Sequence, residues 1–139
     1  METETLRFMV QAWECDHLGH VNVRSYMGWL ADAAFALVAP LGMGAREAAR
    51  NGVSMAAVHA ELDFMGELNG GDIVVARSRI EELGERKIVF RNRFQRLEDG
   101  RAILGGKLMT VCMDLKTRRA VPWPPAFVAA VRGQMAEAA

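Results

Sequence analysis

Most of the ionisable side chains that can do chemistry near neutral pH lie in one short stretch, residues 13–26, which reads Trp-Glu-Cys-Asp-His-Leu-Gly-His-Val-Asn-Val-Arg-Ser-Tyr. In this stretch Asp16 directly precedes His17, and His20 follows three residues after His17. An ionised carboxylate can attack an electrophilic carbonyl carbon itself, or it can deprotonate the water molecule that attacks. The residue pattern leaves both routes open, and also a plainer interpretation in which Asp16 is a turn residue that bonds its own backbone.

The stretch leads into a strongly apolar run, residues 26–39, whose only charged residue is Asp32. Its apolar residues recur at helical spacing and predict a buried helix, with Asn22 or Ser25 as its cap and Pro40 beyond its end. The predicted buried stripe consists of Tyr26, Trp29, Leu30, Ala33, Ala34, Leu37 and Val38. Unpaired N–H groups and the helix dipole favour developing negative charge at the amino end of a helix. A carboxylate just ahead of that end therefore indicates an active site.

The rest of the chain alternates mainly with the period of β-strands. We expect a first strand over residues 4–12, with Leu6, Phe8 and Val10 on one face, and four long strands over 53–65, 72–83, 85–97 and 101–114. Short helices are expected over 45–50 and 126–139. Because glycine-rich connections join the long strands, we expect consecutive strands to pair antiparallel. This order predicts the α+β class, with one antiparallel β-sheet wrapped around one long central helix in a single domain, residues 1–139.

Composition excludes several classes of protein. Apolar residues make up 51% of the 139 and charged residues 24%, as in a globular domain. Lys plus Arg and Asp plus Glu number 17 each, so no net charge attracts nucleic acid or an anionic membrane, and we expect neither as a partner. The acidic N-terminus, and two cysteines without zinc or redox spacing, lead us to expect a cytoplasmic location.

The motif Asp-His-Leu-Gly-His-Val-Asn at 16–22, followed by Tyr26 in an apolar helix and then by four long strands, resembles the hotdog-fold thioesterases. Within them it is similar to the 4-hydroxybenzoyl-CoA thioesterase-like (YbgC-like) branch, over nearly the whole chain. The resemblance implies a hotdog fold and an acyl-CoA thioesterase that hydrolyses its substrate to free acid and coenzyme A. It also implies that Asp16 is catalytic and that a backbone N–H near Val23 polarises the thioester carbonyl.

The same resemblance implies a homodimer or homotetramer with active sites at subunit junctions, which would also protect an exposed edge strand. Residues that we expect to bind or orient the substrate are His17, His20, Asn22, Tyr26 and, farther along the chain, His59. Candidates for holding the phosphates of coenzyme A are Arg91, Arg93 and Lys107. We expect no metal and no cofactor, because no further His or Cys follows the motif at ligand spacing.

Two other functions stay open at this point. An enoyl-CoA hydratase or dehydratase on the same fold would use an Asp/His pair, but in a different motif from the one found here. A non-catalytic module would bind an acyl-CoA or an acyl carrier protein without releasing thiol. The identity of the acyl group depends on the shape of a pocket, which one sequence does not reveal.

Overall fold

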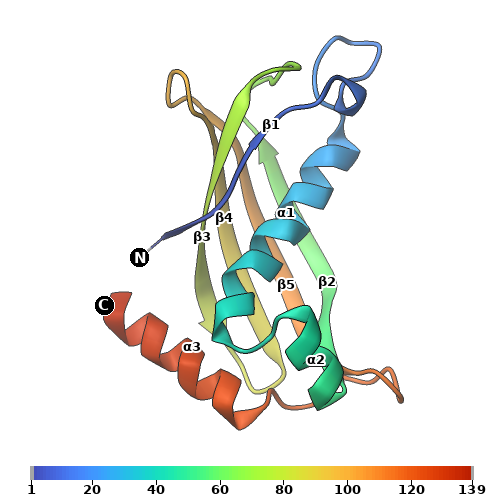
Figure 1. The fold of residues 1–139 in the computed structure, drawn as a ribbon, viewed down its shortest axis with the longest axis vertical. Coiled ribbons are helices and arrows are strands. Elements are labelled where there is room, and N and C mark those ends of the chain that lie inside the picture. The colour runs from blue at the N-terminus through green and yellow to red at the C-terminus, as the bar shows by residue number, and fades with distance from the viewer. Residues whose placement is uncertain (1, 139) are drawn as a thin grey trace.

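The computed structural model describes residues 2–138, in which one five-stranded antiparallel sheet wraps around one long helix (Figure 1). In chain order the elements are β1 (Thr3–Met9), a 3-10 turn (Ala12–Glu14), α1 (Val23–Val38), a second 3-10 turn (Ala39–Leu41), α2 (Ala45–Asn51), β2 (Val53–Phe64), β3 (Ile73–Leu83), β4 (Lys87–Arg96), β5 (Ala102–Asp114) and α3 (Pro125–Ala138). The predicted α+β class, with a sheet around a central helix, is confirmed.

The central helix α1 begins at Val23 because Asn22 caps it. The side-chain Oδ1 of Asn22 accepts a 3.0 Å hydrogen bond from the backbone N–H of Arg24, which satisfies one of the unpaired donors of the first turn. The apolar face of α1 lies against the sheet, and all seven residues of the predicted stripe are buried. Burial of this face, rather than intrinsic helix propensity, supplies most of the stability of such a helix.

The sheet contributes its half of the core from alternate residues of each strand. In β4 the side chains of Ile88, Phe90 and Phe94 are fully buried against the helix side, as the alternation predicts. Asn92 occupies the same face and is also fully buried. Arg91 and Arg93 lie on the opposite, outer face of the sheet, beside residues of β3 and β5.

The expected pairing of β2 with β3 is wrong. The order across the sheet is β1-β3-β4-β5-β2, so β2 pairs with β5, and residues 65–72 carry the chain from one edge of the sheet toward the other. Leu68 in this segment is fully buried, and its carbonyl accepts the N–H of Val21 at 2.9 Å. Because the segment packs against the 13–26 stretch instead of forming a tight hairpin, β3 pairs with β1 and β4.

Close approach of helix and sheet depends on Gly106 in β5. A Cβ atom at this position would lie 2.5 Å from Cδ1 of Leu30, which is fully buried on α1. Glycine therefore lets the helix sit directly on the strand.

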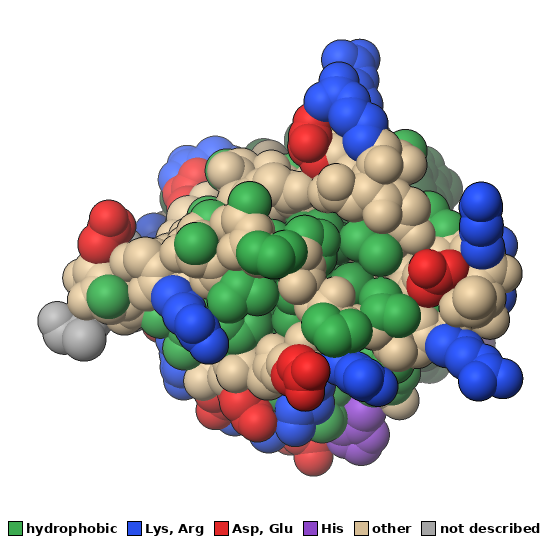
Figure 2. Space-filling view, turned by 90° about the horizontal axis from the view of Figure 1, so that it is seen from below, with side chains coloured by type: hydrophobic (Ala, Val, Ile, Leu, Met, Phe, Trp, Pro, Cys, Tyr) green, Lys and Arg blue, Asp and Glu red, His purple; other side chains and the backbone are tan. Residues whose placement is uncertain are grey.

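The two shorter helices α2 and α3 lie at the end of the molecule opposite the start of α1 (Figure 1). Seen from this end, hydrophobic side chains gather at the centre and charged side chains lie around them (Figure 2). Within residues 2–138 no single helix is long and apolar enough to cross a membrane. Val23–Leu41 and Ala45–Asn51 reach the required length and composition only together, as a pair bent by 68°.

Candidate active site

Asp16 lies in a tight loop between β1 and α1. The loop is closed by an isolated antiparallel bridge between Cys15 and Val21. The backbone N–H of Asp16 donates to the carbonyl of His20 at 3.1 Å, and the N–H of Gly19 donates back to the carbonyl of Asp16 at 3.0 Å. Gly19 has a φ of 87°, a conformation that glycine adopts without strain.

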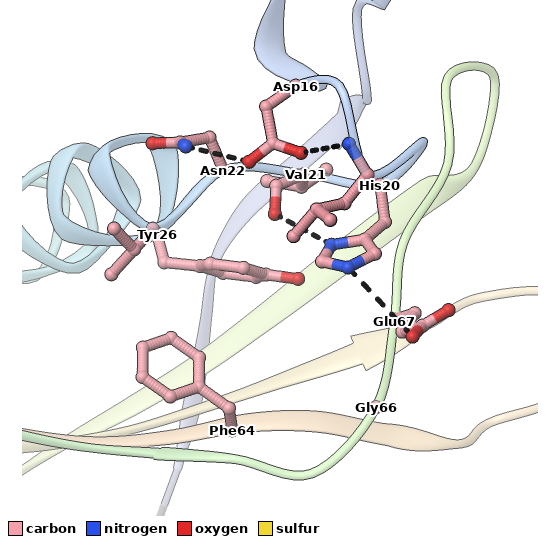
Figure 3. Close-up of a pocket in the computed structure, with 10 residues that line it drawn as sticks. Asp16, His20, Val21, Asn22, Tyr26, Phe64, Gly66 and Glu67 are labelled. Atoms are coloured by element: carbon pink, nitrogen blue, oxygen red, sulfur yellow. Dashed lines mark hydrogen bonds and ion pairs between the residues drawn. The ribbon is translucent and has the colours of Figure 1, made fainter.

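Both carboxylate oxygens of Asp16 accept hydrogen bonds. Oδ2 accepts from the side-chain amide of Asn22 at 2.8 Å, and Oδ1 accepts from the backbone N–H of Leu18 at 2.9 Å (Figure 3). These two bonds, that of Asn22 first, lower the pKa of Asp16 below its ordinary value because they stabilise the charged form. The carboxylate is therefore ionised and held in one orientation at neutral pH.

The amino end of α1 presents a backbone donor beside this carboxylate. Near the helix start, the N–H of Asn22 donates to the carbonyl of Glu14, and those of Arg24 and Ser25 donate to Asn22. Among the contacts within residues 2–138, the N–H of Val23 has no acceptor. Such an unpaired donor at a helix amino end is suited to bind a developing oxyanion.

A cavity of about 480 Å³ opens at this point, and it joins the loop, the helix start and the end of β2 (Figure 3). Its lining residues are Asp16, Leu18, His20, Val21, Asn22, Val23, Tyr26, Phe64, Gly66 and Glu67. Two carboxylates and one imidazole therefore face a pocket that is otherwise largely apolar. A pocket of this size with a few convergent polar groups is typical of a small-molecule site.

One wall of the cavity is aromatic. The rings of Tyr26 and Phe64 meet edge to face with their centroids 5.4 Å apart, and Tyr26 also packs edge to face on Trp29. Burial raises the pKa of Tyr26 to about 12, so its hydroxyl is neutral and can donate a hydrogen bond at physiological pH. Figure 3 shows this hydroxyl directed toward the imidazole of His20.

His20 lies between the helix and the crossing segment 65–72. Its Nδ1 is 3.3 Å from the carbonyl of Val21, a contact in which Nδ1 carries the proton and donates. Its Nε2 is 3.9 Å from Oε1 of Glu67. In the neutral imidazole, this arrangement leaves Nε2 as an acceptor near the cavity.

The structure brings together five of the sequence candidates and leaves five outside the cavity. Asp16, His20, Asn22, Val23 and Tyr26 line it. His17 is exposed on the loop, and His59 is exposed on β2. Arg91, Arg93 and Lys107 lie on the outer face of the sheet, where Arg91 bonds Glu81 and Arg93 bonds Glu2.

Sequence reasoning missed three side chains at or near the site. Phe64 and Glu67 line the cavity only because β2 lies beside β5 and the next segment crosses beneath the motif. No local signal in the sequence indicates this crossing. Glu14 is 6% exposed, and its proximity to Asp16 in the sequence was the only signal available.

The cavity contains the elements of an acyl-transfer site: an oriented carboxylate, a backbone donor at a helix end and an apolar wall. Within residues 2–138 no group of three or more His, Cys, Asp or Glu side chains is arranged to hold a metal ion. Both cysteines, Cys15 and Cys112, are free thiols.

Comparison with curated proteins finds two relatives of limited identity. The chain is 26% identical over 117 residues to the chloroplastic acyl-acyl carrier protein thioesterase ATL3 of Arabidopsis thaliana, covering 84% of this chain and 62% of that protein. It is 27% identical over 116 residues to the L-carnitine dehydrogenase/betainyl-CoA thioesterase of Agrobacterium fabrum, covering 84% of this chain and 24% of that protein. The chain thus spans less than two thirds of either relative.

Among solved structures, a protein from Staphylococcus aureus in complex with CoA superimposes with a TM-score of 0.88 at 16% identity, over 96% of this chain and 84% of that one. This likeness concerns the fold. The family model of the thioesterase-like superfamily matches residues 10–131, which include the loop of Asp16, α1 and four of the five strands, β2 to β5. The chain therefore belongs to the thioesterase-like superfamily, and its sheet around a central helix is the hotdog fold.

Proposed function

We propose that this protein is an acyl-CoA thioesterase that hydrolyses an acyl-CoA to free acid and coenzyme A. The observation that carries the proposal is that the Asp16 carboxylate and the amino end of α1 line one cavity. Membership of the thioesterase-like superfamily supports the reaction class. The curated relatives, one named for an acyl carrier protein thioester and one for a CoA thioester, support a thioester substrate.

In the proposed reaction Asp16 acts in one of two ways. As a nucleophile, its carboxylate adds to the thioester carbonyl and the thiolate of coenzyme A leaves; water then hydrolyses the resulting mixed anhydride. As a general base, it takes a proton from the water that adds to the carbonyl. The lowered pKa keeps the carboxylate ionised at neutral pH, the state that both routes require.

The N–H of Val23 is proposed to bind the carbonyl oxygen as negative charge develops on it. Loss of a single donor of this kind raises the activation barrier by about 3 kcal/mol. His20, Asn22 and Tyr26 are proposed to orient the substrate and the carboxylate. His17 and His59 are also proposed to contact the substrate, although both are exposed and neither lines the cavity.

Coenzyme A binding is proposed to involve more than one subunit. Arg91, Arg93 and Lys107 project from the outer face of the sheet, and none of them lines the cavity. They would serve a coenzyme A whose acyl end enters the cavity of a neighbouring subunit. A homodimer or homotetramer with β2, an edge strand, at its junction fits this proposal.

We propose no metal or redox cofactor, so activity should survive treatment with EDTA.

The proposed function is tested by measuring thiol release from a panel of acyl-CoAs with the wild type and Asp16→Asn. We expect Asp16→Asn to lose roughly 10²-fold or more in rate with little change in melting temperature. Asp32→Asn is the matched control, because Asp32 is an exposed carboxylate on α1 that does not line the cavity. Saturable acyl-CoA binding without thiol release by the wild type would instead favour a binding module.

A further inference from the structure

Glu14 is a buried carboxylate that the proposed chemistry does not use. It ends the 3-10 turn between β1 and the Asp16 loop and is 6% exposed. Its Oε1 accepts the backbone N–H of Gln11 at 2.9 Å, and its Oε2 accepts the indole N–H of Trp29 at 3.0 Å. Burial of a carboxylate is costly unless it is hydrogen-bonded, so these two donors hold Glu14 in a defined position.

The contacts of Glu14 reach both halves of the site. Trp29 lies on α1, one turn beyond Tyr26, whose ring it meets edge to face at 5.2 Å between centroids. The backbone carbonyl of Glu14 accepts the N–H of Asn22 at 2.9 Å. Asn22 in turn caps α1 and donates its side-chain amide to Asp16. One residue thus contacts the helix through its side chain and the loop through its backbone.

We propose that Glu14 is a positioning residue, which fixes the position of α1 relative to the Asp16 loop. In that position the Val23 N–H and the Asp16 carboxylate can both reach the carbonyl group of one bound substrate. This inference rests on the proposed thioesterase function. A leucine or methionine would fill the same space without the cost of burying a charge, but it would accept no hydrogen bond. The carboxylate accepts two hydrogen bonds, one from Gln11 at the start of the 3-10 turn and one from Trp29 on α1.

The pKa of the Asp16 carboxyl distinguishes positioning from a simple effect of charge. The charged or titratable groups that face Asp16 are His17 and His20 on its own loop, with Tyr26 on α1 and Glu67 on segment 65–72 across the cavity. Removing the negative charge of Glu14 would by itself lower the pKa of Asp16. Displacing Asn22 would raise that pKa, because the hydrogen bond from Asn22 is the main cause of its lowering.

The test compares Glu14→Gln, Trp29→Phe and the double variant with the wild type. A glutamine oxygen can accept from only one of the two donors, and Trp29→Phe removes one donor while keeping an aromatic ring. We expect each single variant to lose about 10- to 100-fold in kcat, since small misplacements of reacting groups have effects of this size, with little change in KM. The loss of kcat in the double variant should be smaller than the product of the two single losses, because both changes break the same hydrogen bond between Trp29 and Glu14.

Phe90→Leu is the control for lost stability, because Phe90 is fully buried in the same core and takes no part in the hydrogen bonds of Glu14. It should lower the melting temperature and leave kcat near that of the wild type. The pKa of the Asp16 carboxyl, followed by NMR titration, should rise in Glu14→Gln whether or not any acyl-CoA is turned over. A lower or unchanged Asp16 pKa in Glu14→Gln, or an equal loss of kcat in Phe90→Leu, would overturn the inference. An inactive wild type with the expected pKa rise would refute the thioesterase function and leave the positioning role standing.

Discussion

The side chain of Asn22 joins the carboxylate of Asp16 to the first turn of α1. Its Oδ1 accepts the N–H of Arg24 at 3.0 Å, and its Nδ2 donates to Oδ2 of Asp16 at 2.8 Å (Figure 3). The residue that starts the helix therefore also orients the proposed catalytic group. Any change at this position is expected to affect both helix stability and the ionisation of Asp16.

Replacing Asn22 by Asp should move the acid limb of kcat/KM to higher pH. An aspartate keeps the capping oxygen, but it removes the amide donor and sets a second carboxylate beside Asp16, so the pKa of Asp16 rises. In the wild type the pKa of Asp16 is lower in the folded protein than in the unfolded chain. The ionised carboxylate therefore stabilises the fold at pH values above the pKa that Asp16 has in the unfolded chain. That stabilisation is lost as pH falls through the folded value. Rate profiles that extend well below pH 4 check this, and an unmoved limb in the variant would argue that another group controls it.

Val23→Pro should remove the proposed oxyanion donor without breaking α1. Proline is well tolerated at the first helical position, and Asn22 before it already has the extended conformation (φ −77°, ψ 149°) that a following proline requires. We expect kcat to fall by about 10²- to 10³-fold with a nearly unchanged circular dichroism spectrum. Val23→Ala, which keeps the N–H, should retain near wild-type kcat. If the two variants behave alike, the N–H of Val23 is not the donor.

Tyr26→Phe tests the hydroxyl apart from the aromatic wall. The variant keeps the edge-to-face contacts with Phe64 and Trp29 and removes only the group directed at His20. If this hydroxyl donates one hydrogen bond to the bound substrate, worth about 0.5–1.5 kcal/mol, its removal should lower kcat/KM by roughly two- to twelvefold. Tyr26→Ala should in addition lower stability by about 3–5 kcal/mol, as is typical when a buried aromatic ring is removed. Chemical denaturation of both variants measures the second effect, and a fall above 100-fold in Tyr26→Phe would assign the hydroxyl a direct part in the reaction.

Acyl groups that carry a carboxylate should be poor substrates. Asp16 and Glu67 both line the cavity, and no lysine or arginine is among its lining residues. At an effective dielectric constant near 20, two like charges in such a space repel by a few kcal/mol at most, so we expect a penalty of about tenfold or more in kcat/KM relative to a neutral acyl group of equal length. An acyl group ending in a quaternary ammonium should not suffer this penalty.

The same series in Glu67→Gln should narrow the difference between neutral and anionic acyl groups. The side chain of Glu67 is 74% exposed, so its charge is screened by dissolved salt. Added salt should therefore also reduce the difference in kcat/KM between neutral and anionic acyl groups. Equal rates for all three acyl groups in the wild type would contradict a role for cavity charge in selecting the substrate.

Gly106→Ala should destabilise the fold through its contact with Leu30. The added Cβ would meet Cδ1 of Leu30 at 2.5 Å, so the leucine or the helix must shift, at a cost of about 1–3 kcal/mol. Gly105→Ala is a matched control in the adjacent position, where the nearest atom is Cε of Met65 at an ordinary 3.5 Å. Thermal unfolding compares the two, and equal melting temperatures would show that α1 accommodates the methyl group freely.

Features encoded in neighbouring residues could be predicted from the sequence. The buried stripe of α1, its cap at Asn22 and the inward residues of β4 follow from periods and capping preferences that operate over a few residues. For the same reason five of the ten candidate residues line the cavity, since four of them lie within the single stretch 16–23 and Tyr26 follows one turn later.

Features that depend on contacts between distant residues could not be predicted. The placement of β2 beside β5, and with it the position of Phe64 and Glu67 in the cavity, depends on how segment 65–72 packs under the motif. Strand order is selected by the burial of whole faces, and a glycine-rich connection of this length permits either a hairpin or a crossing. The local residues specified the carboxylate and the helix end that it serves. The tertiary structure alone decided which other side chains enclose the space between them, because only the packing of the complete sheet on α1 brings those segments together.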